Sequence, residues 1–345
     1  MKKILVVGAG FAGATIARIL HDNGYEVHVI DRRWCLGGNA ADRIKPGTGI
    51  RVHYFGPHLF HTNNEKVFNF LSRFTEWYPY KHKVKALHND EYYTLPVNKE
   101  TKERVGEGNV LDIFFRPYTQ KMWGRPLEEV NPKILDRVPI RDDDNEYYFP
   151  NDKFQFLPKE GYEGLFKNML AGIPTWLNNC FDHEVALRYH HVFTSQSIDA
   201  YYGFCHGELP YRTIEMREKE FKKDWHQPVA TVNFTSWNGP TRATEWKHLM
   251  YSNPNPDVTV VTYEYPKEYV RDRRDPWHTK HQDDGYYPIQ TPENQALYEK
   301  YKVIPNPNTT FIGRCGTYQY LDMHQVINQS MQIAEKFMRS NEGQE

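Results

Sequence analysis

The stretch that decides the fold spans residues 2–40 and reads KKILVVGAGFAGATIARILHDNGYEVHVIDRRWCLGGNA. Residues 4–7 are a short run of apolar, mainly β-branched side chains, which is typical of a buried strand. Residues 8–13 then read G-x-G-x-x-G, and residues 14–21 are mostly good helix formers that end at an Asn-Gly pair. Residues 27–30 form a second apolar run. The stretch therefore predicts a strand–helix–strand unit with its glycines at the first turn.

Each glycine of this turn has a separate physical task. Gly8 allows the tight turn, Gly10 lets a pyrophosphate approach the main chain, and Gly13 lets the helix pack closely on the strand. The N–H groups of the turn, at residues 11–12 (Phe11 and Ala12) among others, lie at the positive end of the helix and favour phosphate. Asp31 closes the second strand, where a carboxylate accepts hydrogen bonds from ribose hydroxyls or, alternatively, caps the strand end. The pattern predicts a bound dinucleotide.

Composition narrows the class of protein. The chain has 345 residues, enough for about two domains, and a net charge of −1, which gives no field for nucleic acid or an anionic membrane. Its four cysteines are widely spaced without a C-x-x-C pair, and His58 and His61 have no carboxylate or cysteine at ligand spacing, so we expect no metal site. No run approaches about 18 apolar residues. We expect a soluble, cytoplasmic protein.

Beyond residue 40 the periodicity alternates between helical and strand-like. Helices are predicted at 63–74, 110–123, 161–169 and 322–339, with another short helix opening at Pro132. Strands are predicted at 49–55, 82–97 (with a turn at residues 89–90), 147–149, 154–157, 191–194, 208–221, 228–234, 258–265 and 310–313. Because nucleotide-type and antiparallel segments alternate, we expect domains that are interleaved in sequence.

A glycine pair after the second strand indicates which dinucleotide binds. Residues 36–39 read Leu-Gly-Gly-Asn, and Arg33 lies shortly before them. This resembles the R-x-x-x-x-G-G extension of the flavin-binding amine oxidase and mutase group, which NAD dehydrogenases generally lack. The resemblance implies FAD as the cofactor.

Ten stretches together resemble the UDP-galactopyranose mutase family, and they follow the family's order over nearly the whole chain. They are GAGFAGATIA (8–17), GGNA (37–40), YFGPHLFHT (54–62), YTQKMWGR (118–125), RVPIR (137–141), NEYYF (145–149), VNFTSWNGPTR (232–242), VTYEYP (261–266), GYYPI (285–289) and GRCGTYQYLDMHQVI (313–327). The implied fold is α/β: a Rossmann-like FAD-binding domain (1–79, 180–206 and 305–345), an inserted small helical domain with a mobile lid (98–140), and an antiparallel sheet domain for substrate (80–97, 141–179 and 207–304).

The resemblance also implies roles for individual residues. Catalytic roles fall to Arg137, Arg242, His61 and Trp123. Substrate contacts fall to Tyr118 and Thr119 near the base, to Trp123, Arg137, Tyr148, Arg242 and Tyr287 at the diphosphate, and to Tyr320 and Asp322 near the sugar and flavin. Cofactor contacts fall to Gly8, Gly10, Phe11, Ala12, Gly13, Asp31, Arg32, Gly38, Asn39, His58, Arg314, Asp322 and Met323. Independently of the family, arginine forks and tyrosine hydroxyls are suitable donors for a diphosphate.

The implied reaction converts UDP-galactopyranose to UDP-galactofuranose through an adduct between the sugar and N5 of reduced FAD, with an external reductant such as NAD(P)H. Alternatives are the same chemistry on UDP-N-acetylgalactosamine or a dTDP-6-deoxy sugar, an amine-oxidase-like oxidoreductase, and a nucleotide-binding protein without catalysis. The segment between Val97 and Tyr118 is shorter than the helical insertion of bacterial members. That insertion helps to form their dimer, so a homodimer is less expected here.

Overall fold

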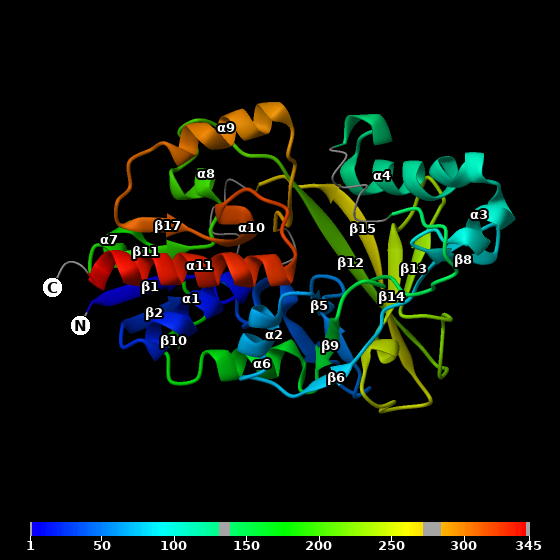
Figure 1. Cartoon of the computed structure of the whole chain (residues 1–345), viewed down its shortest axis with the longest axis horizontal. Coiled ribbons are helices and arrows are strands. Elements are labelled where there is room, and N and C mark those ends of the chain that lie inside the picture. Colours follow the sequence, from blue (N-terminus) through cyan, green and yellow to red (C-terminus); the bar gives the residue numbers. More distant parts are fainter. Residues whose placement is uncertain (1, 131–138, 272–283, 343–345) are drawn as a thin grey trace.

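The computed structural model describes residues 2–130, 139–271 and 284–342. It has a lobe built on a parallel sheet and a lobe built on a larger, mainly antiparallel sheet, and the chain passes between them several times (Figure 1). Both ends of the chain lie in the first lobe (Figure 1). The interleaving expected from the sequence is therefore present, and the fold is the expected α/β fold with parallel and antiparallel sheets.

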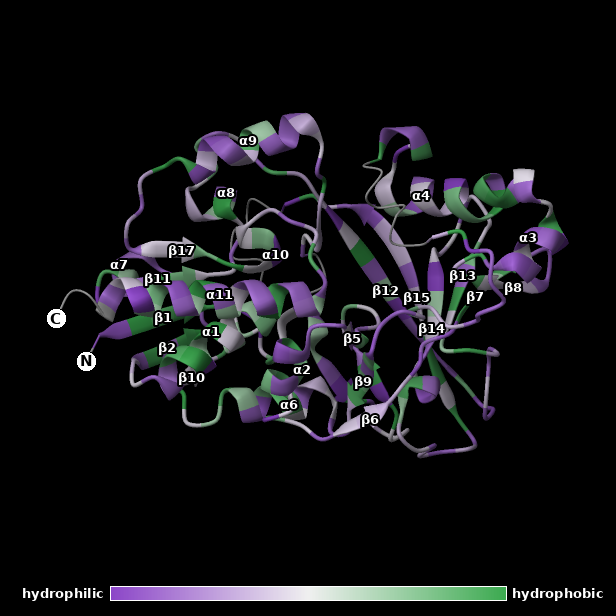
Figure 2. Ribbon diagram, in the orientation of Figure 1, coloured by the Kyte–Doolittle hydropathy of each residue, from purple (hydrophilic) through white to green (hydrophobic). Residues whose placement is uncertain are grey.

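The first lobe is centred on a five-stranded parallel sheet with the order β10-β2-β1-β11-β17. Its strands are β1 (Lys3–Val7), β2 (Glu26–Ile30), β10 (Thr175–Trp176), β11 (His191–Thr194) and β17 (Thr309–Phe311). Ile4, Leu5 and Val6 of β1 are fully buried because both faces of the sheet are covered. Figure 2 shows apolar colouring in β1 and β2, whereas α9 (Pro292–Lys302), at the top of the view, is largely hydrophilic.

Helices α1 (Phe11–Asp22) and α11 (Met323–Glu342) pack against each other over one face of this sheet (Figure 1). The two helices share a core in which small side chains of α1, such as Ala14 and Ala17, allow close approach to Ile327 and Ala334 of α11. The remaining helices of the lobe are η1 (Gly38–Ala40), α2 (Glu65–Leu71), α6 (Gly161–Met169), α7 (His183–Ala186), α8 (Ile198–Tyr201), α9 (Pro292–Lys302) and α10 (Gly313–Gly316).

The second lobe contains a seven-stranded sheet with the order β16-β12-β15-β14-β13-β7-β8. Its strands are β7 (Val84–His88), β8 (Glu91–Leu95), β12 (Tyr211–Phe221), β13 (Thr231–Phe234), β14 (Arg242–Glu245), β15 (Thr259–Glu268) and β16 (Tyr287–Pro288). A short helix, η5 (Trp246–Leu249), directly follows β14. All neighbours are antiparallel except β7 and β13. Two small sheets join the lobes: β3 (Asp42–Ile44) with β4 (Arg51–His53), and β5 (Phe60–Thr62) with β9 (Phe154–Pro158) and β6 (Trp77–Pro79).

A small helical unit packs beside the seven-stranded sheet. It comprises α3 (Lys99–Val105), η2 (Glu107–Asn109), the π-helical turn η3 (Leu111–Phe115), α4 (Arg116–Trp123) and η4 (Leu127–Glu129). The guanidinium of Arg212 on β12 donates to the main-chain oxygens of Lys121 (3.1 Å) and Met122 (2.9 Å), which satisfies carbonyls at the end of α4. The ammonium of Lys121 donates in turn to the carbonyls of Phe234 and Pro240, both at 2.8 Å. The end of α4 is thus fixed to the sheet.

Most predicted elements form close to their expected limits. The helix at 161–169 and the strand at 191–194 match in full, and Asn64 caps α2 by accepting from the N–H of Val67. The expected strand at 147–149 is wrong, because only an isolated bridge between Lys83 and Tyr147 forms there. The short helix expected at Pro132 lies outside the described residues. The three domain ranges stay predictions, although β10 pairs with β2 and so puts 175–176 in the parallel sheet.

Helix α6 is capped by a carboxylate that is distant in sequence. Its own N-cap residue, Glu160, makes no capping hydrogen bond through its side chain in the described structure. Asp42 on β3 is buried, and its two oxygens accept from the N–H groups of Tyr162 (2.7 Å) and Glu163 (2.9 Å). The guanidinium of Arg51 on β4 lies 3.1 Å from the same carboxylate. Asp42 therefore joins β3, β4 and α6 through buried charge. None of the described helices is both long and apolar enough to cross a membrane.

We expect Asp42→Ala to lower the free energy of unfolding by about 3 kcal/mol, because it leaves Arg51 without its buried partner and two N–H groups unsatisfied. Urea denaturation followed by circular dichroism measures the loss. The matched control is Asp182→Ala, which removes a solvent-exposed cap that accepts from the N–H of Glu184 in α7; here we expect about 1 kcal/mol or less. Equal losses for the two variants would contradict the role of burial.

Candidate functional site

A cavity follows the carboxyl ends of the parallel strands. Its wall contains Val7 at the end of β1, Asp31 after β2, Ser195 after β11 and Gly313 after β17. Ligands of open parallel sheets bind at this edge. The cavity brings together twelve of the residues predicted to contact the cofactor: Gly8, Gly10, Phe11, Ala12, Gly13, Asp31, Arg32, Gly38, Asn39, His58, Arg314 and Met323.

The two glycine-rich stretches at the cavity interlock. A Cβ on Gly13 would lie 1.8 Å from the carbonyl oxygen of Gly8, and a Cβ on Gly38, whose φ is +57°, would lie 3.0 Å from the Cα of Gly10. Gly10 is the N-cap of α1, and no side chain among the described residues caps this helix. The first N–H groups of α1 therefore face a cavity that side chains do not fill. This arrangement fits the pyrophosphate of a dinucleotide such as FAD.

Asp31 also holds the turn above it. Its Oδ2 accepts from the N–H of Ala9 (2.7 Å) and its Oδ1 accepts from the N–H of Arg33 (2.8 Å). The carboxylate lies in the cavity wall and acts as a cap at the same time, so the two readings of Asp31 made from the sequence are compatible. A ribose hydroxyl at this point would share an oxygen with a main-chain donor.

Two histidines lie at the end of β4 and in the loop after it, and His58 of the loop lines the cavity. The N–H of His58 donates to Nδ1 of His53 (3.1 Å), and Nδ1 of His58 lies 2.9 Å from the carbonyl oxygen of Gly56. Burial lowers the pKa of each of the two imidazoles to about 3. Both are therefore neutral at physiological pH, and they shape the rim without adding charge.

The aromatic residues predicted to bind substrate gather next to this cavity. The rings of Tyr287 and Tyr320 stack at 5.4 Å, and Trp123 meets them edge-on at 6.3 Å and 6.0 Å. The guanidinium of Arg314, which lines the cavity, lies 5.3 Å and 5.0 Å from the two tyrosine ring centres. Tyr118 of α4 packs in the same cluster. Arg314 thus connects the cavity with a substrate-side aromatic cluster of Tyr118, Trp123, Tyr287 and Tyr320.

Arg242, at the start of β14, is paired with a carboxylate that sequence reasoning did not single out. Its Nε lies 2.8 Å from Oε1 of Glu264 on β15, whose side chain is 1% exposed. Burial alone would lower the pKa of Arg242, but Glu264 raises it well above the ordinary value. A Cβ on Gly56 would lie 3.6 Å from Nη2 of Arg242, so this glycine leaves room for the guanidinium. One signal could have pointed to Glu264. It lies two residues after Thr262, which is buried, and alternate residues of a strand share one face of the sheet.

His61 lies on β5 in a separate aromatic group. Its Nδ1 is 2.6 Å from Oδ2 of Asp152, and its ring stacks on Phe149 at 3.6 Å. Phe149 in turn meets the ring of Tyr148 edge-on at 4.9 Å, and His324 approaches His61 from α11 at 5.7 Å. His61 therefore lies between the segment of Tyr148 and the start of α11. The sequence carried no local signal for Asp152, because its partner is 91 residues away.

Three further predicted site residues are not among the described residues that line the cavity or its aromatic cluster. Asp322 is not among the residues that line the cavity, and its N–H donates to Oε1 of Gln325 (2.8 Å), which is half of a capping box at the start of α11. Thr119 is 5% exposed within α4. Arg137 lies outside the described residues. Within the described part of the chain, no three His, Cys, Asp or Glu side chains gather where they could hold a metal ion.

We expect Gly13→Ala to lose the cofactor, because the added methyl group would force α1 away from the carbonyl of Gly8. Flavin absorbance per mole of purified protein should fall at least tenfold. Gly108→Ala is the matched control, since a Cβ there meets no atom within 4 Å. Full flavin content in Gly13→Ala would contradict the predicted fit.

We expect Asp152→Asn to change the tautomer of His61, because the carboxylate oxygen accepts from Nδ1–H and leaves Nε2 unprotonated in the neutral ring. Nitrogen-15 NMR of labelled histidine reports the tautomer directly. Asn63→Ala removes a second, exposed donor to Asp152 and the acceptor of the Lys153 N–H, but it leaves the contact between His61 and Asp152 and should leave the His61 signals in place. Unchanged His61 signals in Asp152→Asn would remove Asp152 from this role.

Comparison with known proteins identifies the family. Residues 113–320 match the family model described as UDP-galactopyranose mutase, and residues 6–74 match an NAD(P)-binding Rossmann-like domain. The chain is 35% identical to a probable UDP-galactopyranose mutase of Klebsiella pneumoniae, over all of this chain and 97% of that protein. It is 32% identical to a dTDP-fucopyranose mutase of Escherichia coli, over 99% of this chain and all of that protein.

Solved structures show the same fold. A crystal structure of reduced UDP-galactopyranose mutase superposes with a TM-score of 0.76 at 16% identity, covering 98% of this chain and 94% of that one. A putrescine oxidase superposes with a TM-score of 0.58 at 12% identity, covering 98% of this chain and 99% of that one. With a family model that spans more than half of its length, this chain belongs to the UDP-galactopyranose mutase family and is an isomerase of that type.

Proposed function

We propose that the chain interconverts UDP-galactopyranose and UDP-galactofuranose, with reduced FAD bound in the cavity at the parallel sheet. The observation that carries the proposal is the position of Arg314, which lines the cavity and lies over the rings of Tyr287 and Tyr320. A ligand bound against the aromatic cluster would therefore lie beside the cavity in which the Gly8–Gly13 turn would hold the pyrophosphate of a dinucleotide. When bound, reduced flavin supplies a nucleophilic nitrogen, N5, for the anomeric carbon of the sugar.

The protein's own part in this reaction is to bind and orient. Arg242 holds a fixed positive charge, because Glu264 orients its Nε and leaves the Nη atoms for a diphosphate. The hydroxyls of Tyr118, Tyr148 and Tyr287 add neutral donors, and burial raises the pKa of Tyr118 and Tyr287, so these two stay protonated. Charge that develops on the leaving diphosphate is stabilised by such donors, and a held diphosphate stays close for its return. Arg137 is proposed as the second arginine.

The ten stretches that resemble the mutase family support further parts of the proposal. His61 and Trp123 are proposed to contact the sugar and the diphosphate, Thr119 the base, and Asp322 the sugar or flavin. An external reductant such as NAD(P)H is proposed to keep the flavin reduced.

A second candidate substrate is a dTDP-6-deoxy sugar, which the 32% identity to the dTDP-fucopyranose mutase favours. Both candidates share a nucleoside diphosphate, so the donors around Arg242 serve either one. The difference lies in the base and in the substituent at C6 of the sugar. The likeness to putrescine oxidase concerns the fold alone.

The test is anaerobic incubation of the dithionite-reduced enzyme with UDP-galactofuranose, followed by chromatography. We expect UDP-galactopyranose to form, and Arg242→Ala to lower turnover by about 10²-fold or more with FAD retained, because one charged donor to the diphosphate is lost. Arg217→Ala is the matched control, since this arginine lies on the exposed part of β12 and pairs with Glu215.

Three outcomes would contradict the proposal. If no pyranose forms from the UDP sugar but dTDP-fucofuranose is converted, the second candidate replaces the first. If neither sugar is converted under reduction, mutase activity itself is rejected. In a separate assay in air, turnover that consumes oxygen would indicate an oxidoreductase.

A further inference from the structure

One buried carboxylate connects the cofactor cavity with the substrate-side aromatic cluster. Asp284 is 4% exposed and lies three residues before Tyr287. Its Oδ2 accepts from Nη2 (2.6 Å) and Nε (3.1 Å) of Arg33, and its Oδ1 accepts from Nη2 of Arg32. Both arginines follow β2 directly. A carboxylate from the second lobe is therefore held by two guanidinium groups at the strand end that forms the cavity.

On the cofactor side, the contacts continue without a gap to the glycine turn. Arg33 also donates through Nη2 to Oδ1 of Asn39 (2.9 Å), and its N–H donates to Asp31. Asp31 accepts from the N–H of Ala9, between the first two glycines of the turn. A dinucleotide that engages the turn and the Asp31 carboxylate must therefore act on the groups that hold Arg33 and, through it, Asp284.

On the substrate side, the main chain after Asp284 has little freedom. The N–H of Tyr286 donates to the carbonyl oxygen of Arg212 (2.9 Å), and the carbonyl oxygen of Tyr286 accepts from Nη1 of Arg314 (3.3 Å). The ring of Phe55 packs between the two sides, 4.3 Å from the guanidinium of Arg33 and 5.6 Å from the ring of Tyr286. A shift of Asp284 would therefore move Tyr286 and, next to it, Tyr287.

Strand β12, which carries Arg212, extends the connection to α4. Arg212 pairs with Tyr287 in the register of β12 with β16. Its side chain donates to the carbonyl oxygens of Lys121 and Met122, directly before Trp123. The positions of Tyr287 and Trp123 thus both depend on where β16 lies against β12.

Charge explains why the connection is strong. Asp31 and Asp284 together balance Arg32 and Arg33, so the group is neutral as a whole. Burial raises the pKa of Asp284, but the two arginines more than compensate and lower it below the ordinary value. Removing one buried carboxylate leaves a guanidinium charge uncompensated, which changes the geometry of the whole group.

We propose that Asp284 is a positioning residue that couples binding in the dinucleotide cavity to the placement of Tyr287 and Trp123. Occupation of the cavity by FAD orders β16 and the end of α4. FAD therefore strengthens the binding of a nucleoside diphosphate beside β16 and α4. Because coupling between two sites is reciprocal, the nucleoside diphosphate strengthens the binding of FAD by the same factor. The second and third statements rest on the proposed function, whereas the first concerns only FAD and the chain.

The first experiment compares hydrogen exchange in the apoprotein and the FAD-loaded protein, for peptides that contain 286–288 and 118–123. We expect FAD to slow exchange in both peptides of the unaltered chain and to have at least fivefold less effect in Asp284→Asn. Asp284→Glu keeps the charge and should restore part of the effect. Lack of FAD-dependent protection in the unaltered chain overturns the proposal, whatever the activity is.

The matched control is Glu218→Gln. Glu218 also joins the two lobes through two cations, Arg43 and Lys45 of the β3 hairpin, but at a more exposed place on β12. This variant should show the same FAD-dependent protection as the unaltered chain. Equal loss of protection in Glu218→Gln and Asp284→Asn would show that any contact between the lobes suffices and would overturn the specific role of Asp284.

The second experiment measures the Kd of FAD by fluorescence, without and with saturating UDP or dTDP. In the unaltered chain we expect either nucleotide to tighten FAD about tenfold, and in Asp284→Asn we expect the factor to fall toward one. A factor that Asp284→Asn leaves unchanged overturns the coupling.

If neither nucleotide binds, the proposed function fails, while the exchange experiment still decides the role of Asp284. If Asp284→Asn does not fold, Arg33→Lys, which removes the guanidinium fork and keeps the charge, is measured in its place, with the same outcomes.

Discussion

The close contact between α1 and the end of β1 is the constraint on which the rest of the structure depends. Gly13 must lie against the carbonyl oxygen of Gly8, where any side chain would collide. This contact directs the first N–H groups of α1 into the edge of the sheet instead of into solvent. The second glycine pair then packs its main chain on Gly10, so the cavity is walled by backbone. Segments from the rest of the chain only have to reach this edge.

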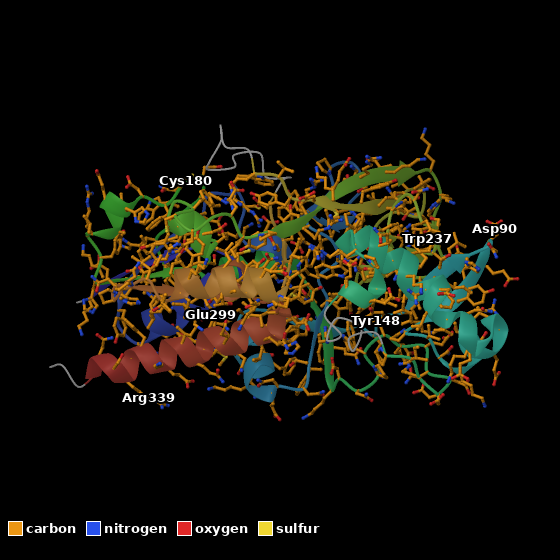
Figure 3. All side chains as sticks on the ribbon, turned by 90° about the horizontal axis from the view of Figure 1, so that it is seen from above. Asp90, Tyr148, Cys180, Trp237, Glu299 and Arg339 are labelled. Carbon is orange, nitrogen blue, oxygen red and sulfur yellow. The ribbon has the colours of Figure 1, made fainter. Side chains whose placement is uncertain are left out.

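The arginines around that edge are each paired with a buried carboxylate, but in two different ways. Arg32 and Arg33 are paired with the buried Asp284, and Arg242 is paired through Nε with the buried Glu264. Arg33 uses its Nε and Nη2 donors on Asp284 and Asn39 inside the protein, which fixes it as part of the frame. The second pair engages Nε of Arg242, and Tyr118 and Tyr287 lie near the same guanidinium. Arg32 and Arg33 thus hold the frame, whereas Arg242 is the arginine that we propose for a diphosphate. Figure 3 labels Cys180, which lines the cavity, and Tyr148, which lies toward the second lobe.

The sequence predicted the parts of the structure that depend on local chemistry. The glycine turn and the limits of α6 and β11 follow from neighbours within a few residues. The pairs that organise the site are different, because they join residues far apart: Asp284 is 251 positions from Arg33, and Asp152 is 91 positions from His61. No periodicity encodes such pairs. The false strand at 147–149 has a related cause, since its aromatic side chains pack on His61 and His82 instead of in a sheet.

The neutral histidines indicate how the site keeps a constant charge. Burial lowers the pKa of His53, His58 and His82 to about 3, so none of these three gains a proton near neutral pH. Arg242, in contrast, keeps its proton under all ordinary conditions, since Glu264 raises its pKa. In the proposed function, a diphosphate held by Arg242 and by protonated tyrosines would meet the same charge from these groups across the neutral range. The buried imidazoles stay neutral and contribute shape and hydrogen bonds, while the positive charge for the proposed leaving diphosphate would come from arginine. Such a site suits a reaction in which the cofactor supplies the nucleophile and the protein has to hold the departing group in place.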